Sequence, residues 1–111
     1  MTDFRIPDSH VQHAFEVLKS GDHAASRAAY EFAEKQLKVT LAKAAAQSNE
    51  TSIAARENAG LRSMEYERAL TDFKLVAEAY YKARDRREAS VSIIDAWRTQ
   101  QSDMRAMGRV G

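Results

Sequence analysis

The stretch that decides the fold is SMEYERALTDFKLVAEAYYKARDRREASVSIIDAWRTQQSDMRAM, residues 63–107, which contains neither Pro nor Gly. It is rich in Ala, Glu, Lys, Arg and Met, which lose little free energy in a helix. Ser63 can cap the helix, and Glu65 and Glu67 fall in its first turn, where the helix dipole favours carboxylates. Gly108 and Gly111 mark the other end. We therefore predict one helix over residues 64–107, roughly 65 Å long at about 1.5 Å per residue.

Apolar side chains recur along this helix at alternating steps of four and three residues, which is typical of coiled-coil packing. This seam begins with Tyr66, Leu70, Phe73, Ala77 and Tyr80. It continues in the same register with Arg84, Arg87, Val91, Ile94 and Arg98. The seam therefore becomes basic for one heptad and then apolar again. The stems of Arg84 and Arg87 can cover apolar surface while their charges reach solvent; alternatively, these two arginines set the register of an oligomer or contact a partner.

Three shorter helices are expected before the long one, over residues 8–19, 23–47 and 52–59. The first of these helices is expected to start at Pro7, which suits the first turn of a helix, and to end before Gly21. On the second helix one apolar stripe comprises Tyr30, Ala33, Leu37, Leu41 and Ala44, and Phe32 and Val39 lie beside it and widen the apolar face. Gly60 is interpreted as the stop of the third helix. The alternative is one helix over residues 51–107, with Gly60 tolerated at about 1 kcal/mol.

The composition indicates an all-α chain, since only one Pro and four Gly occur in 111 residues. We assign residues 1–111 to a single domain, with two N-terminal helices packed antiparallel on the long C-terminal helix. The second helix is too short to cover the whole of the long one, and Val91, Ile93, Ile94 and Trp97 would then lack a cover within one chain. Because such a patch is unfavourable in a monomer, we expect a homodimer or higher oligomer formed through the C-terminal half.

Bulk properties argue against several classes of function. The 17 Lys and Arg nearly balance the 16 Asp and Glu, giving a net charge of +1, which argues against a mainly electrostatic nucleic-acid binder. Without Cys, the chain has no disulfide, thiolate nucleophile or Cys-based metal site. The start of the chain, MTDFRIPDSH, lacks the apolar core of a secretory signal, and no apolar run is long enough to span a membrane. We therefore expect a cytoplasmic protein without a membrane partner.

No residue pattern points to catalysis or to a metal. His10, His13 and Glu16 share one helical face, but no second cluster supplies the three or four ligands that a metal site needs. A G-x-S-x-G turn and a P-loop are both lacking. We interpret the chain as a non-enzymatic protein with no catalytic residues, no cofactor and no metal.

The candidate binding residues lie on the second half of the long helix. The cluster Ile93-Ile94-x-x-Trp97-Arg98 contains the only Trp of the chain. It is either a buried core anchor or an interface hot spot, since Trp and Arg are enriched in hot spots. The predicted partner-binding set is Tyr80, Tyr81, Arg84, Arg87, Ile94, Trp97 and Arg98.

A second hypothesis is that the basic residues bind nucleic acid, as in an accessory factor of replication or recombination. Cations beside Tyr80 and Tyr81 can contact phosphates while the rings stack on bases. Asp85 and Glu88 interrupt this cluster, so binding by one chain would be weak, although an oligomer would multiply it. The residues assigned to this alternative are Lys82, Arg84, Arg86, Arg87, Arg105 and Arg109. A third hypothesis is that the chain forms a purely structural oligomer, such as a virion or scaffold component.

Residues 57–107 resemble small helical early or accessory proteins encoded by tailed phages and prophages. The resemblance is carried by Ser63-x-x-Tyr66, Ala69-Leu70, Ala77, Arg84-x-x-Arg87-x-Ala89, Ile93-Ile94-x-x-Trp97-Arg98 and Arg105-Ala106. Its most specific part is the Trp-Arg pair after two apolar residues. The resemblance implies a non-catalytic accessory or inhibitor protein, possessing no catalytic residue, that binds a host or phage protein or nucleoprotein machine in the bacterial cytoplasm. Residues 1–50 lie outside it.

Overall fold

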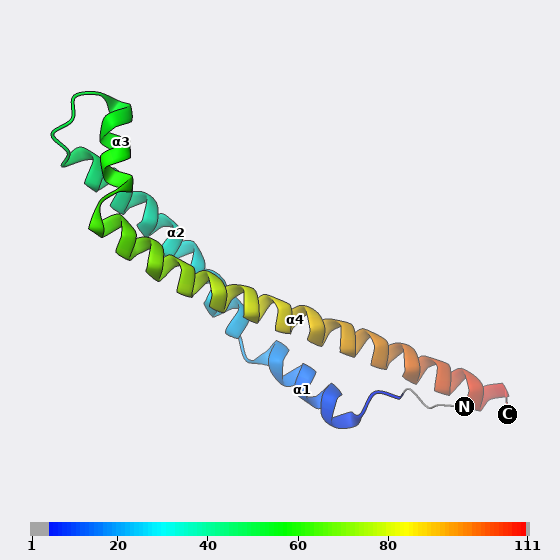
Figure 1. Ribbon diagram of the computed structural model, residues 1–111. Coiled ribbons are helices and arrows are strands. Elements are labelled where there is room, and N and C mark those ends of the chain that lie inside the picture. The colour runs from blue at the N-terminus through cyan, green and yellow to red at the C-terminus, as the bar shows by residue number, and fades with distance from the viewer. Residues whose placement is uncertain (1–4, 111) are drawn as a thin grey trace. The chain divides into compact units, whose positions relative to one another are not determined.

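The computed structural model describes residues 5–110, and for residues 109 and 110 it describes the backbone only. This part of the chain is built from helices and contains no strand (Figure 1). The four helices are α1 (Asp8–Lys19), α2 (Asp22–Ala46), α3 (Ile53–Leu61) and α4 (Met64–Val110). The predicted all-α class is confirmed. The alternative of one helix over residues 51–107 is wrong, because α3 ends at Leu61 and α4 begins at Met64.

Two serines begin the last two helices. Ser52 Oγ accepts a hydrogen bond from the Ala55 amide at 3.1 Å, which caps α3. Ser63 Oγ accepts from the Tyr66 amide at 3.2 Å and donates to the Gly60 carbonyl at 2.7 Å. One hydroxyl therefore ends α3 and starts α4. Gly60 lies inside α3, which ends one residue later at Leu61, so the interpretation of Gly60 as the stop of that helix is wrong.

The chain folds into two compact units that share α4. Unit 1 contains α1 and α4 from Lys82 onward, and unit 2 contains α3, α2 from Ala24 and α4 up to Tyr81. Each unit is therefore made by one part of α4 and by the helices that pack on that part.

In unit 1, α1 runs antiparallel to the second part of α4 (Figure 1). Near the start of α1 the Ile6 amide donates to Gln100 Oε1 at 3.1 Å. The buried residues of the unit are Val11, Ala14, Ser90 and Ile94. Ile94 is only 3% exposed, so the expectation that it lacks a cover within one chain is wrong. The physical reason is that α1 presents a small apolar face, formed by Val11 and Ala14 three positions apart, that packs on this part of α4.

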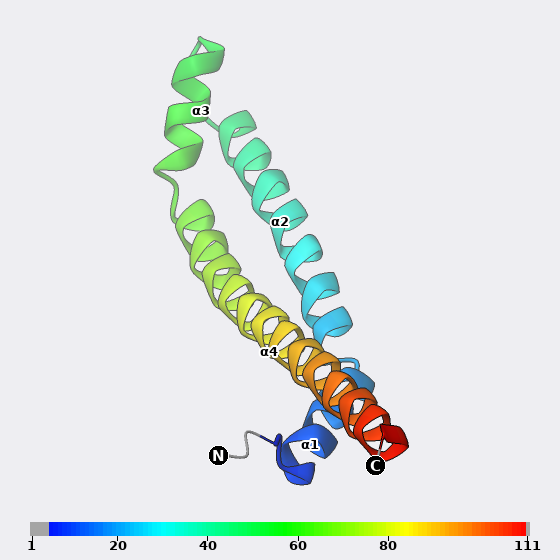
Figure 2. The same ribbon diagram turned by 90° about the vertical axis from the view of Figure 1, so that its right-hand side faces the viewer.

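In unit 2, α2 runs antiparallel to the first part of α4, and α3 lies beside the end of α2 (Figure 2). Tyr30 of α2 packs against Phe73 and Tyr80 of α4, with ring centroids 5.3 and 4.9 Å apart. The seam residues Leu37, Leu41, Leu70, Phe73 and Ala77 are half-buried. Within unit 2 the only buried residue is Gly60, which has no side chain. The two antiparallel helices thus meet along the predicted seam without enclosing it.

Candidate interaction surfaces

The predicted partner-binding residues divide between the two units. Tyr80 and Tyr81 belong to unit 2 and form an aromatic cluster with Tyr30 and Phe73. Tyr81 and Tyr80 have ring centroids 5.4 Å apart. A hydrogen bond with Tyr81, followed by partial burial, raises the pKa of Tyr30 above its ordinary value. These two tyrosines therefore already help to join α2 to α4.

Ile94 and Trp97 lie where α1 packs on α4 in unit 1. Ile94 is buried, so within this chain it is a core residue. The Trp97 ring meets the Phe15 ring edge-to-face, with centroids 6.1 Å apart and planes at 87°. Trp97 remains half-buried and also borders a hollow of about 280 Å³ with Arg98, Gln101 and Arg105. Trp97 therefore packs against α1 through Phe15 and is also partly exposed at the surface of unit 1.

Four arginines share one face of α4 in unit 1, which we term the arginine face: Arg84, Arg87, Arg98 and Arg105. At about 100° per residue their positions fall within about 60° of one another around the helix. Arg87, Arg98 and Arg105 are exposed, and Arg84 is half-buried with Nη2 at 3.5 Å from Asp85 Oδ1. Glu88 and Asp95 flank the face without interrupting it. Arg84 and Arg87 lie at one end of this face and Arg98 and Arg105 at the other, with Val91 and the buried Ile94 between them. Each pair offers planar guanidinium groups to an acidic surface.

The residues assigned to nucleic-acid binding do not form one patch. By helical position, Lys82 and Arg86 are turned about 100–160° around α4 from Arg84 and Arg87. Arg86 lines a hollow of about 420 Å³ together with Glu16 and Asp22, and these carboxylates disfavour a phosphate there. Arg105 shares the arginine face, and the Arg109 side chain lies outside the described residues.

The histidines singled out in the sequence lie at the surface of unit 1. His10 is exposed, and His13 lines the same hollow as Glu16, Asp22 and Arg86. Within residues 5–110 there is no group of three or more His, Cys, Asp or Glu side chains placed to hold a metal ion. In the same range, no helix combines the length and the apolar character needed to cross a bilayer.

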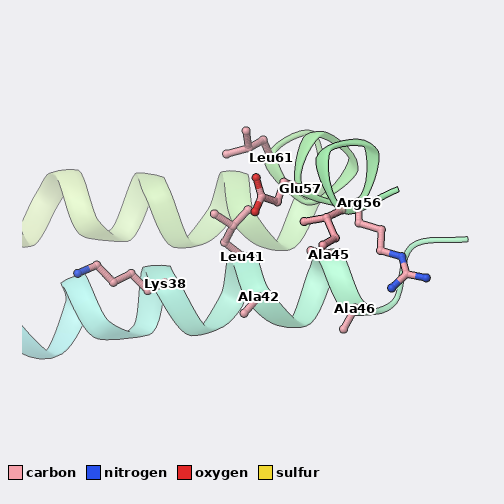
Figure 3. A pocket seen from close by; sticks show the side chains of 9 residues that line it. Lys38, Leu41, Ala42, Ala45, Ala46, Arg56, Glu57 and Leu61 are labelled. Carbon is pink, nitrogen blue, oxygen red and sulfur yellow. The ribbon is translucent and has the colours of Figure 1, made fainter. Parts of the chain in front are cut away.

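Unit 2 contains a groove between α2 and α3 that the sequence did not indicate (Figure 3). Its volume is about 450 Å³, and its lining residues on α2 recur at steps of three, one, three and one. The groove is lined by Lys38, Leu41, Ala42, Ala45, Ala46, Ile53, Arg56, Glu57 and Leu61. Ile53 and Leu61 are exposed. The groove exists because Gly60 brings α3 close to Leu41 and Ala45 of α2.

A second groove of unit 2 runs between α2 and α4, and we term it the alanine groove. Its volume is about 600 Å³, and it is lined by Ala29, Phe32, Ala33, Gln36, Thr40, Ala69, Asp72, Phe73 and Val76. Phe32 is 65% exposed. The one sequence signal for this groove is the position of Phe32 and Val39 beside the main apolar stripe of α2. No local pattern could show that α4 supplies the opposite wall.

The residues that carry the phage-protein resemblance have different environments in the structure. Ser63 caps α4 and Ile94 is buried, so both have structural roles. Arg87, Arg98 and Arg105 are exposed. No family model, no curated protein and no solved structure matches the chain. The resemblance therefore rests on these residues alone.

Proposed function

We propose that this chain is a non-catalytic accessory or inhibitor protein of the phage type, which acts in the bacterial cytoplasm by binding a host or phage nucleoprotein machine. The observation that supports this proposal is the arginine face of unit 1, next to the half-buried Trp97. Arg and Trp dominate the binding energy of many protein interfaces. Guanidinium groups bind carboxylates in a bidentate manner, so the surface recognised on the partner is an acidic protein surface.

The runner-up is a nucleic-acid-binding accessory factor of replication or recombination. One observation favours it: three of its assigned residues, Arg84, Arg87 and Arg105, share the arginine face. Against it stand the position of Arg86 beside two carboxylates and the net charge of only +1. Four phosphate contacts would give modest affinity that falls steeply with salt. We therefore place protein binding first.

Charge reversal on the arginine face tests the proposal. Tagged wild-type chain, Arg98→Glu and Lys74→Glu are incubated with nuclease-treated bacterial lysate, and captured proteins are quantified by mass spectrometry. Lys74 is an exposed cation in unit 2 and serves as the matched control. We expect a protein that wild type and Lys74→Glu capture equally and that Arg98→Glu captures about tenfold less.

Three results would contradict this proposal. Equal capture by all three chains would exclude the arginine face. Loss of all capture after nuclease treatment, with binding to a labelled oligonucleotide that falls log-linearly with salt, would support the nucleic-acid alternative. Stable assembly without any captured partner would support the structural oligomer.

A further inference from the structure

The hollow beside Trp97 in unit 1, which we term the tryptophan hollow, has a lining of mixed chemistry. Its volume is about 280 Å³, and it is lined by Trp97, Arg98, Gln101 and Arg105 of α4. Trp97 and Gln101 are half-buried, and both arginines are exposed. Its described lining residues therefore combine one aromatic surface, one amide and two positive charges, and none of them is a carboxylate.

The four lining residues follow one another along one side of α4. Trp97, Gln101 and Arg105 are spaced four residues apart, which keeps them on neighbouring positions of the helix surface. Arg98 and Arg105 are seven residues apart, so their Cα atoms are separated by about 10 Å along the helix axis. Arg105 Nε donates to the Gln101 carbonyl oxygen at 3.4 Å, which folds the Arg105 side chain back toward the hollow.

The charge of Arg98 is not neutralised within the part of the chain that the structure describes. Among residues 5–110 Arg98 forms no ion pair. Asp95 and Asp103, the nearest carboxylates along α4, are turned about 60° and 140° around the helix from Arg98. The exposed Arg98 guanidinium can therefore form a bidentate bond with a carboxylate of another molecule.

We propose that the tryptophan hollow binds a short acidic peptide segment of the partner protein, with one apolar side chain on the Trp97 ring and carboxylates on Arg98 and Arg105. This inference rests on the proposed function and specifies both the site and the part of the partner that enters it. The separation of about 10 Å between the two arginines equals three residues of extended chain at about 3.3 Å each. Two carboxylates on either side of an apolar residue can therefore reach both guanidinium groups.

The surroundings of the hollow favour a peptide over a nucleic-acid strand. A phosphate backbone gains affinity from a continuous row of cations. Val91 and the buried Ile94 separate this hollow from the other two arginines of the arginine face, so a strand would meet two cations here. The Gln101 amide can both donate to and accept from a peptide backbone. Two guanidinium groups beside a tryptophan are typical of a hot spot for protein binding.

Trp97 reports occupancy of the hollow directly, because it is the only tryptophan of the chain. The probe is the synthetic peptide Asp-Asp-Phe-Asp-Asp, capped at both ends, which contains no tryptophan. We expect titration of the full chain with this peptide to change the Trp97 emission in a saturable manner. Replacing Phe by Ala in the peptide, or its four Asp by Asn, should raise the dissociation constant about tenfold.

Three variants of the chain test the site. Arg98→Gln should raise the dissociation constant of the peptide about tenfold, and Gln101→Glu should do the same because it adds a carboxylate to the hollow. Lys19→Gln is the control: it removes an exposed cation of unit 1, at the end of α1, that does not line the hollow, and the affinity should stay unchanged. A Trp97 emission that does not respond to the peptide, or equal effects of Arg98→Gln and Lys19→Gln, would overturn the proposal.

A single-stranded oligothymidylate is the second probe. A change in Trp97 emission with this probe alone, weakened in Arg98→Gln, would show that the hollow binds nucleic acid and would refute the peptide. If neither probe binds while capture of a lysate protein still depends on Arg98, the hollow is refuted and the proposed function stands. Peptide binding at the hollow, with lysate capture that is independent of Arg98, would support the peptide site and contradict the proposed function.

Discussion

At Gly60 the absence of a side chain sets the distance between two helices. A Cβ atom built on Gly60 would lie 3.1 Å from the Leu41 carbonyl oxygen and 3.2 Å from the Ala45 amide nitrogen. Both are backbone atoms of α2, which cannot move aside as a flexible side chain can. The sequence marks Gly60 only as a helix breaker, because spacing along the chain does not tell which residue lies opposite.

Gly60→Ala should lower the free energy of unfolding by about 1 kcal/mol, since the crowding of α2 outweighs the gain in helix propensity. Urea denaturation followed by circular dichroism measures this difference. Gly108→Ala is the matched control, because nothing lies within 4 Å of its added Cβ and the propensity gain remains. It should leave stability unchanged or raise it by a few tenths of a kcal/mol. Equal stabilisation by both substitutions would disprove the close approach of α3 to α2.

Tyr30 gives unit 2 a dependence on alkaline pH. The hydrogen bond with Tyr81, then burial and neighbouring negative charge, raise the pKa of Tyr30 above its ordinary value of 10.0. The fold thus favours the neutral phenol. This contribution to stability is fully present below the ordinary pKa and is lost as pH rises through the raised pKa.

Tyr81→Phe should lower the pKa of Tyr30 toward its ordinary value, because the hydrogen bond is removed. Tyrosinate absorbance during an alkaline titration measures the change. Tyr66→Phe, on α4 of the same unit, removes a phenol that does not contribute to the raised pKa of Tyr30, so it should leave the Tyr30 titration in place. A Tyr30 titration unchanged in Tyr81→Phe would show that the hydrogen bond does not cause the shift.

Among the elements, α1 depends most on its packing. It has 12 residues, and isolated helices of about 12–15 residues are marginal in water. Its stability comes from burial of Val11 and Ala14 and from the contact of Phe15 with Trp97. The same packing covers Ile94, so α1 decides which side of α4 stays open to a partner.

Phe15→Ala should loosen α1 at a cost of about 1–2 kcal/mol, since it removes an aromatic pair and half-buried apolar area. The emission of Trp97, the only tryptophan, should shift to the red as water reaches the ring. Leu18→Ala, three residues further along α1, is the control: Leu18 is already exposed, and its loss should leave the emission nearly unchanged. Emission that stays the same in Phe15→Ala would mean that α1 does not shield Trp97.

Several element boundaries could be predicted from the sequence because their causes are local, but α3 continues through Gly60 to Leu61 and α4 continues through Gly108 to Val110. Ser63 caps α4 and Gly21 adopts a φ of +75°, which favours glycine, and both signals are visible in the chain. Which residues of each helix are buried in the fold could not be predicted in the same way. The register placed Ile94 and Arg98 together on the seam, yet Ile94 is buried and Arg98 exposed. A periodic pattern identifies an apolar face, but the helix that covers it is chosen by tertiary packing.

For the candidate sites the sequence identified individual residues but not their combinations. Trp97 and Arg98 belong to the predicted partner-binding set, and in the structure both line one hollow together with Gln101 and Arg105. The alanine groove escaped prediction because its walls come from α2 and α4, which lie far apart in the chain. Its small residues carry no chemical signal in the sequence.

For the molecule as a whole, the two units should respond differently to protein concentration. Unit 1 has a buried core of its own, whereas unit 2 has no buried side chain among its described residues. If the oligomer expected from the sequence forms through unit 2 instead of the C-terminal half, mass action stabilises unit 2 as concentration rises. Hydrogen exchange at low and high micromolar concentration should therefore show increasing protection of the α2 amides and constant protection of the α1 amides. The reverse result, with α1 alone responding, would place self-association in the C-terminal half.

The units are also nested along the chain, because unit 2 is one continuous segment that interrupts unit 1. On the ribosome, all of unit 2 is available as soon as Tyr81 has emerged. By contrast, α1 is synthesised before the residues of α4 on which it packs, Ser90, Ile94 and Trp97. The Ile6 amide, just before α1, donates to Gln100, which lies 94 positions later in the chain. During synthesis Val11 and Ala14 therefore remain exposed until Ile94 has emerged.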